Sequence, residues 1–168
     1  VAASDVKFVL LQHADGKTAL IRGDVDAWAG LDPIMAQAEV EDGARLFYRK
    51  PENNTWGVLN VREDFAAKNP EVVKRVIAVY ERARRHALAN PAELKAALVK
   101  AARLPDNVIE RQLTRTDLST SVIGPVQAEA IEQAGVALQQ AEVIKADVNV
   151  KATVAALIDP SYTAGLKS

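Results

Sequence analysis

The sequence contains no cysteine, and this absence excludes several kinds of chemistry. Without thiols there is no disulfide framework, no thiolate nucleophile and no cysteine-ligated zinc site. The absence does not fix the compartment, because proteins without cysteine are compatible with both reducing and oxidising environments. Evidence on localisation must therefore come from another feature of the sequence.

The sequence also lacks an excess of charge of either sign, and it lacks long apolar runs. The 21 Lys and Arg residues balance 22 Asp and Glu residues, and no dense basic block is present. We therefore expect no nucleic-acid partner and no attraction to an anionic membrane. No apolar run approaches the roughly 20 residues that span a bilayer. The opening residues, Val1 to Asp5, lack a charged region followed by an apolar stretch, so we expect any export signal to lie outside this sequence.

Hydrophobic residues make up 49% of the chain, which is typical of a folded domain with a core. The first third reads as α/β and the remainder as almost purely helical. Short apolar runs predict four strands, at Val6–Leu11, Val25–Ala29, Ala44–Tyr48 and Trp56–Val61. Because the first run begins almost at once, we expect the chain to be a fragment that starts in mid-fold.

Helix signals are stronger than strand signals. Glycine caps, Asp-Pro and Asn-Pro pairs and i, i+3, i+4 apolar spacing mark the ends and faces of the helices. Asp32 and Asp106 have the chemistry of N-caps. The predicted helices are 17–22, 34–42, 70–89, 92–103, 107–114, 125–142 and 149–157.

The sequence offers little support for catalysis. His13 and His86 stand far apart, without acidic or hydroxyl neighbours at metal-ligand or triad spacing. The glycines do not form a phosphate-binding loop, and the basic cluster Arg82, Arg84, Arg85 and His86 reads as a solvated helix face. We therefore expect no catalytic residue, no metal and no cofactor.

The most informative segment is Gly23 to Pro33. It places Asp26, Trp28 and Asp32 at the predicted carboxyl end of a strand, where open α/β sheets bind their ligands. Packing of Trp28 in the core is an equally good interpretation of the spacing alone.

This segment, Gly-Asp-Val-Asp-Ala-Trp-Ala followed by Asp32-Pro33, resembles the G-D-V-D-A-W-x-x-W-D-P stretch of a known family. The family comprises the periplasmic substrate-binding proteins of ABC importers for aliphatic sulfonates, which are related to the taurine and nitrate binders. Gly43-Ala44-Arg45, Phe65 to Val73 and Leu104-Pro105 resemble later family segments in the same order. The resemblance covers essentially the whole chain, but only the second half of a family member. Leu31 replaces the second tryptophan, and the segment Asn53 to Gly57 also departs from the family pattern.

The resemblance implies an α/β fold of the periplasmic binding protein type II kind, with two lobes and a ligand between them. Residues 1–50 would then belong to the second lobe, 51–55 to a crossover hinge, and 56–168 to the first lobe. The implied ligand is a small organic anion. The residues implied to bind it are Trp28, Asp26, Asp32, Asn54 and Thr55, although Asp32 would act mainly as a helix cap. The implied partner is an ABC permease, and the implied compartment is the periplasm.

Two other functions stay open at this point. The two-lobed architecture also occurs in the ligand-sensing domains of transcription regulators. It resembles as well the pyrimidine synthases for thiamin precursors, but these rely on a cysteine-rich motif that this sequence lacks. The apolar stripe of residues 70–89 would lack its partners in a fragment, so we expect association with the missing half or with a second copy.

Overall fold

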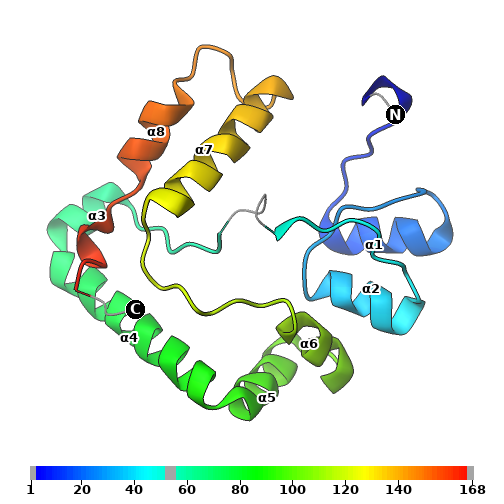
Figure 1. Cartoon of the computed structure of the whole chain (residues 1–168), viewed down its shortest axis with the longest axis horizontal. Coiled ribbons are helices and arrows are strands. Elements are labelled where there is room, and N and C mark those ends of the chain that lie inside the picture. The colour runs from blue at the N-terminus through cyan, green and yellow to red at the C-terminus, as the bar shows by residue number, and fades with distance from the viewer. Residues whose placement is uncertain (1–2, 52–55, 166–168) are drawn as a thin grey trace. The chain divides into compact units, whose positions relative to one another are not determined.

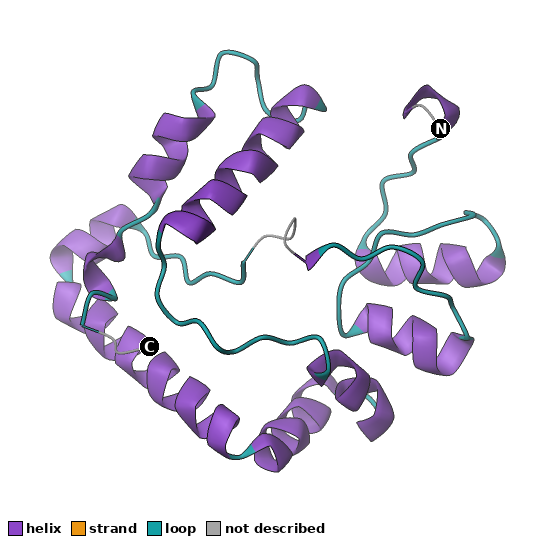
Figure 2. Cartoon of the chain, viewed as in Figure 1, coloured by secondary structure: helices purple, strands orange, loops and turns teal. Residues whose placement is uncertain are grey.

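The computed structural model describes residues 3–51 and 56–165. Within these ranges every regular element is a helix (Figures 1 and 2). The α-helices are α1 His13–Arg22, α2 Ile34–Asp42, α3 Glu63–Lys68, α4 Pro70–Ala89, α5 Pro91–Ala102, α6 Asp106–Leu113, α7 Pro125–Gln140 and α8 Val150–Leu157. Short 3-10 turns lie at η1 Ala3–Asp5 and η3 Pro160–Tyr162.

The helix ends follow the local chemistry of the sequence. Helices α1 and α2 end at Gly23 and Gly43, whose φ angles of 78° and 69° lie in the left-handed region that glycine adopts without strain. Proline begins α4, α5 and α7, because its fixed φ and missing N–H suit the first helical position. The predicted helices are thus confirmed as elements.

Several predicted boundaries were wrong by a few residues. Helix α1 begins at His13 rather than Lys17, and α7 ends at Gln140 rather than Glu142. Asp106 was predicted to be the N-cap of α6, but it is the first residue of that helix, and Pro105 is the N-cap. Helix α3, Glu63–Lys68, was not predicted as a separate element.

The four predicted strands are absent from the described residues, so the strand prediction was wrong there. A strand is stable only when its backbone N–H and C=O groups pair with a neighbouring strand. The segments instead form irregular loops between the helices (Figure 2). Many of their apolar side chains are exposed to solvent, including Phe8 at 76% and Leu10 at 96%.

The chain divides into two compact units, each built from two stretches. Unit 1 comprises residues 1–47 and 90–116, and unit 2 comprises residues 48–89 and 117–168. The predicted lobe division at 51–55 falls partly on residues 52–55, which lie outside the described residues. The division into lobes therefore stays a prediction.

In unit 1, α2 packs against both α1 and α6, and α6 also packs against α5. Ala36 and Ala38 of α2 are buried, and so are Val108 and Ile109 of α6. The small alanine side chains expose little surface of their own and allow the larger aliphatic residues to approach closely. An ion pair of 2.9 Å between Lys17 Nζ and Asp42 Oδ2 joins α1 to the end of α2.

In unit 2, α3 packs against α4, and α7 packs against α8. The amide of Gln139 closes the loop between α7 and α8, because its Nε2 donates to the carbonyls of Lys145, Ala146 and Val148. The N-terminus of α8 is capped by Asn149, whose side chain accepts from the N–H of Ala152 at 3.0 Å.

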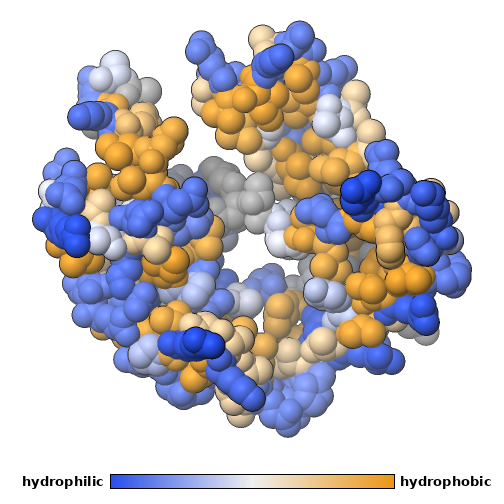
Figure 3. Space-filling view, turned by 180° about the vertical axis from the view of Figure 1, so that it is seen from behind, coloured by the Kyte–Doolittle hydropathy of each residue, from blue (hydrophilic) through white to orange (hydrophobic). Residues whose placement is uncertain are grey.

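Much apolar surface remains uncovered in the described residues. Val73 of α4 is buried, whereas Val76, Val79 and Tyr80 of the same helix are exposed. Figure 3 shows hydrophobic residues on the visible face of the molecule. Among the described helices, none combines the length and the apolar composition needed to cross a bilayer.

Candidate functional site

Trp28 lies on the loop between α1 and α2 and is half-buried. Its indole contacts two glycines, Gly16 of α1 and Gly30 of its own loop. A Cβ atom built on Gly16 would lie 2.6 Å from Trp28 Cδ1, and one built on Gly30 would lie 2.6 Å from Trp28 Cζ3. The indole is therefore held against backbone at both of its ends.

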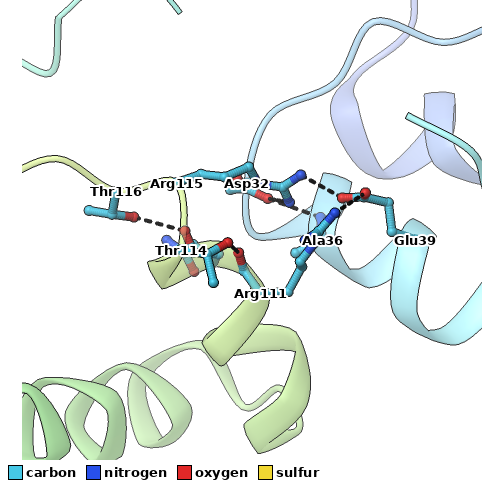
Figure 4. Close-up of polar contacts among 8 residues, drawn as sticks. Asp32, Ala36, Glu39, Arg111, Thr114, Arg115 and Thr116 are labelled. Carbon is cyan, nitrogen blue, oxygen red and sulfur yellow. Dashed lines mark hydrogen bonds and ion pairs between the residues drawn. The ribbon is translucent and has the colours of Figure 1, made fainter. Parts of the chain in front are cut away.

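Asp32 lies four residues after Trp28 and has two partners (Figure 4). Its Oδ1 accepts a hydrogen bond from the N–H of Ala36 at 2.9 Å and another from Arg115 Nη2 at 2.8 Å. Pro33 holds the N-cap position, so Asp32 stands one residue before it. The expected capping contact is thus present, displaced by one position, because the carboxylate satisfies an N–H in the first turn of α2.

Arg115 also binds a second carboxylate, that of Glu39 on α2. Its Nη1 donates to Glu39 Oε2 at 2.5 Å, and Arg111 Nη2 donates to Glu39 Oε1 at 2.9 Å. Figure 4 shows the two arginines directed at α2 from α6 and the residues that follow it. The side chain of Arg115 is only 8% exposed. We call Asp32, Glu39, Arg111 and Arg115 the α2–α6 cluster.

The charges of the α2–α6 cluster balance, with two carboxylates facing two guanidinium groups. Burial of Glu39 raises its pKa, but the hydrogen bonds from Arg111 and Arg115 outweigh this effect and hold the pKa below its ordinary value. Glu39 is therefore ionised at neutral pH. The cluster holds α6 against α2, and it directs its guanidinium groups at carboxylates of the protein itself.

In the part of the chain that the structure describes, Asp26 forms no hydrogen bond or ion pair with this cluster. Asp26 is exposed on the same loop as Trp28. Asn54 and Thr55 lie outside the described residues. Sequence reasoning missed Glu39, Arg111 and Arg115, because the contacts of the two arginines with Glu39 span 72 and 76 positions and no local pattern marks them.

A second polar cluster lies in unit 2, where the sequence had predicted a solvated helix face. Glu81 of α4 is only 7% exposed and accepts two hydrogen bonds from Arg84, at 2.8 and 2.9 Å. Arg85 Nε also donates to Glu81, at 2.5 Å. The prediction was wrong for Arg84, because its Nη1 donates to the carbonyl oxygens of Leu118 at 2.7 Å and Ser119 at 3.3 Å and its side chain is 15% exposed.

These contacts change the acidity of Glu81. The hydrogen bonds from Arg84 and Arg85 stabilise the carboxylate and lower the pKa of Glu81 to about 2. Arg82 and His86 are exposed, as expected for the solvated face. Arg84, through its hydrogen bonds to Leu118 and Ser119, holds the loop after Asp117 against α4.

In the described ranges, no group of three or more His, Cys, Asp or Glu side chains is arranged to hold a metal ion. The geometry instead centres on Trp28, the one predicted ligand residue that is aromatic, half-buried and held by close backbone contacts. Such a side chain is suited to contact an apolar group and to donate one hydrogen bond.

Comparison with known proteins places the chain in a family. Residues 1–94 match the family model described as NMT1/THI5 like. The chain belongs to this family. The match includes Asp26, Trp28 and Asp32, and the family has the periplasmic binding protein type II-like fold.

One curated relative extends this finding. The chain is 30% identical over 127 residues to an Escherichia coli (strain K12) protein named "Putative aliphatic sulfonates-binding protein". The alignment covers 75% of this chain and 39% of that relative, so the chain spans well under half of the relative's length. No solved structure matches the chain. The sulfonate-binding resemblance seen in the sequence is confirmed by the family match and this relative.

Proposed function

We propose that this chain is part of a solute-binding protein that captures a small organic anion, an aliphatic sulfonate, and delivers it to an ABC importer. The observation that carries the proposal is the family match over residues 1–94, which contain Trp28 and Asp32. The name of the Escherichia coli relative supports sulfonate as the class of ligand. Family membership and this name also favour binding without a chemical reaction.

Trp28 is the residue that we propose to contact the ligand. An indole offers an apolar wall for an alkyl chain and an N–H donor for an anionic oxygen. Asp26 ranks below it, because a free carboxylate repels an anion. Asp32 acts through structure, since its carboxylate is occupied by Ala36 and Arg115. Asn54 and Thr55 remain proposed ligand contacts on the strength of the family resemblance.

The same proposal includes an ABC permease as the partner and the periplasm as the compartment. It also includes the lobe division, with residues 1–50 in one lobe, 51–55 as a crossover hinge and 56–168 in the other. If residues 51–55 are a hinge, their dihedral angles differ between ligand-free and ligand-bound structures of the full-length protein. Identical dihedrals in the two forms would place the hinge elsewhere.

The proposed function is tested by calorimetric titration of the full-length protein. The panel pairs ethanesulfonate with propionate, a carboxylate of similar length, and adds taurine and nitrate. We expect ethanesulfonate to bind, and Trp28→Ala to weaken that binding by about tenfold or more, equivalent to ~1.4 kcal/mol.

Two results would count against the proposal. Binding of none of the panel anions would remove the sulfonate assignment. Unchanged affinity in Trp28→Ala, together with a large loss of thermal stability, would make Trp28 a packing residue.

A further inference from the structure

The backbone conformation at Gly16 does not require a glycine. Gly16 is the fourth residue of α1, it is buried, and its N–H donates to the carbonyl of Gln12 at 2.7 Å. Its φ angle lies outside the left-handed region. Glycine within a helix is less favourable than alanine, because it loses more backbone freedom on folding. The presence of glycine here needs another cause.

The indole of Trp28 supplies that cause. A Cβ atom on Gly16 would lie 2.6 Å from Trp28 Cδ1, 3.4 Å from Trp28 Cε2, and closer still to Trp28 Nε1. Carbon atoms that are not bonded pack at about 3.5 to 4.0 Å. Only a hydrogen atom at this position leaves room for the pyrrole end of the ring.

Gly30 does the same at the other end of the ring. A Cβ atom there would lie 2.6 Å from Trp28 Cζ3 and closer still to Cζ2 and Cη2. The φ angle of Gly30 also lies outside the left-handed region. Two glycines, one from α1 and one from the loop before α2, therefore leave room for the two ends of one indole.

We propose that Gly16 and Gly30 are positioning residues that set the orientation of the Trp28 indole and thereby the affinity for the anion. This inference rests on the proposed function, in which Trp28 contacts the ligand. Alanine at either position would displace the ring, because the α1 backbone on one side and the short loop on the other leave a methyl group no space. The displaced ring would then present its apolar face and its N–H in another direction.

The test uses two variants and two matched controls in the full-length protein. The variants are Gly16→Ala and Gly30→Ala. Gly135→Ala is a matched control, because its Cβ would lie 2.6 Å from Val150 Cγ1, within a helix of unit 2. Gly57→Ala is the second control, since a Cβ atom there meets nothing within 4 Å.

Two readouts separate positioning from general overpacking. The first is fluorescence of Trp28, with its emission maximum and acrylamide quenching measured in a background in which Trp56 and every tryptophan of the full-length protein outside this sequence are replaced by Phe. The second is the affinity for ethanesulfonate by calorimetry. We expect Gly16→Ala and Gly30→Ala to shift the emission and to weaken binding by about tenfold. Gly135→Ala lowers the melting temperature and leaves both readouts unchanged, and Gly57→Ala changes none of them.

The outcomes distinguish this inference from the proposed function. Altered Trp28 emission with unchanged affinity in the glycine variants, while Trp28→Ala still loses binding, would overturn the positioning role and leave the ligand contact intact. Unchanged affinity in Trp28→Ala would overturn both. If Gly16→Ala does not fold, the double variant Gly16→Ala with Trp28→Phe provides the test. Recovery of folding by the smaller ring supports the clash, and failure to recover contradicts it.

Discussion

Asp32 and Arg115 are joined by a hydrogen-bonded ion pair of 2.8 Å, although 83 positions separate them in the sequence. The same Asp32 oxygen accepts from the N–H of Ala36. One carboxylate therefore fixes the start of α2 and holds the residues that follow α6. The acidic residue of the Asp-Pro pair acts through the structure of unit 1, and Trp28, four residues earlier, is the proposed ligand contact.

Loss of the Asp32 carboxylate is expected to destabilise the protein more than loss of an ordinary cap. Asp32→Ala removes the acceptor for Ala36 and leaves the buried Arg115 with Glu39 as its remaining carboxylate in the α2–α6 cluster. We expect a loss of about 2 to 3 kcal/mol by thermal or urea unfolding. Asp32→Asn retains a side-chain oxygen for the cap and is expected to lose less.

Asp26→Ala is the control for that experiment, because Asp26 is an exposed acidic residue on the same loop. Its effect is expected to stay within about 0.5 kcal/mol. Equal effects of Asp32→Ala and Asp26→Ala would show that the contacts of Asp32 contribute nothing to stability.

Glu81 is expected to make stability depend on pH in the acid range. Its pKa is about 2 in the folded protein, compared with about 4.3 for a glutamate in an unfolded chain. The lowered value stabilises the fold above the unfolded pKa, and this contribution is lost as the pH falls from about 5 towards 2. Glu81→Gln is expected to make the melting temperature depend less on pH over that window. Glu71→Gln, at an exposed glutamate, is the control. Parallel curves for wild type and Glu81→Gln would contradict the assignment.

Asn149 is expected to contribute measurably to the stability of α8. Its side-chain oxygen accepts from the N–H of Ala152 at the start of the helix. Asn149→Ala should lose about 1 kcal/mol, because an N–H in the first turn loses its partner. Asn149→Asp keeps an acceptor and should lose little. A similar loss in both variants would point to a role other than capping.

The 168-residue chain on its own is expected to associate, either with itself or with an added fragment that carries the rest of the protein. The reason is the exposed apolar surface, which includes Tyr80 of α4 at 57%. Sedimentation velocity of the wild type and of Tyr80→Lys measures this, and the variant should associate less. A monomer that unfolds cooperatively would contradict the expectation and favour a self-sufficient domain.

Helices could be predicted from the sequence because their signals are local. Pro70 and the Asn90-Pro91 pair delimit α4 within a few adjacent residues, and Gly23 and Gly43 mark two helix ends. The strands could not be predicted in the same way. An apolar run such as Val6 to Leu11 gives no information about a pairing partner, and pairing decides whether a strand forms.

The same distinction applies to the site. The capping role of Asp32 follows from its neighbour Pro33, so the sequence revealed it. The bonds from Arg115 to Asp32 and Glu39 span 83 and 76 positions, and local spacing carries no trace of them. Burial of Arg84 was missed for a related reason, since its acceptors Leu118 and Ser119 lie 34 and 35 positions away.

The interleaved make-up of the two units has a consequence for the order in which they complete their packing. Residues 48–89 of unit 2 are translated between α2 and α6 of unit 1. A nascent chain that has completed α2 must therefore wait for Arg115 before the carboxylates of Asp32 and Glu39 meet their guanidinium partner. Until then the buried face of α2 has no α6 to cover it, so unit 1 completes its packing only after residues 48–89 of unit 2 have emerged.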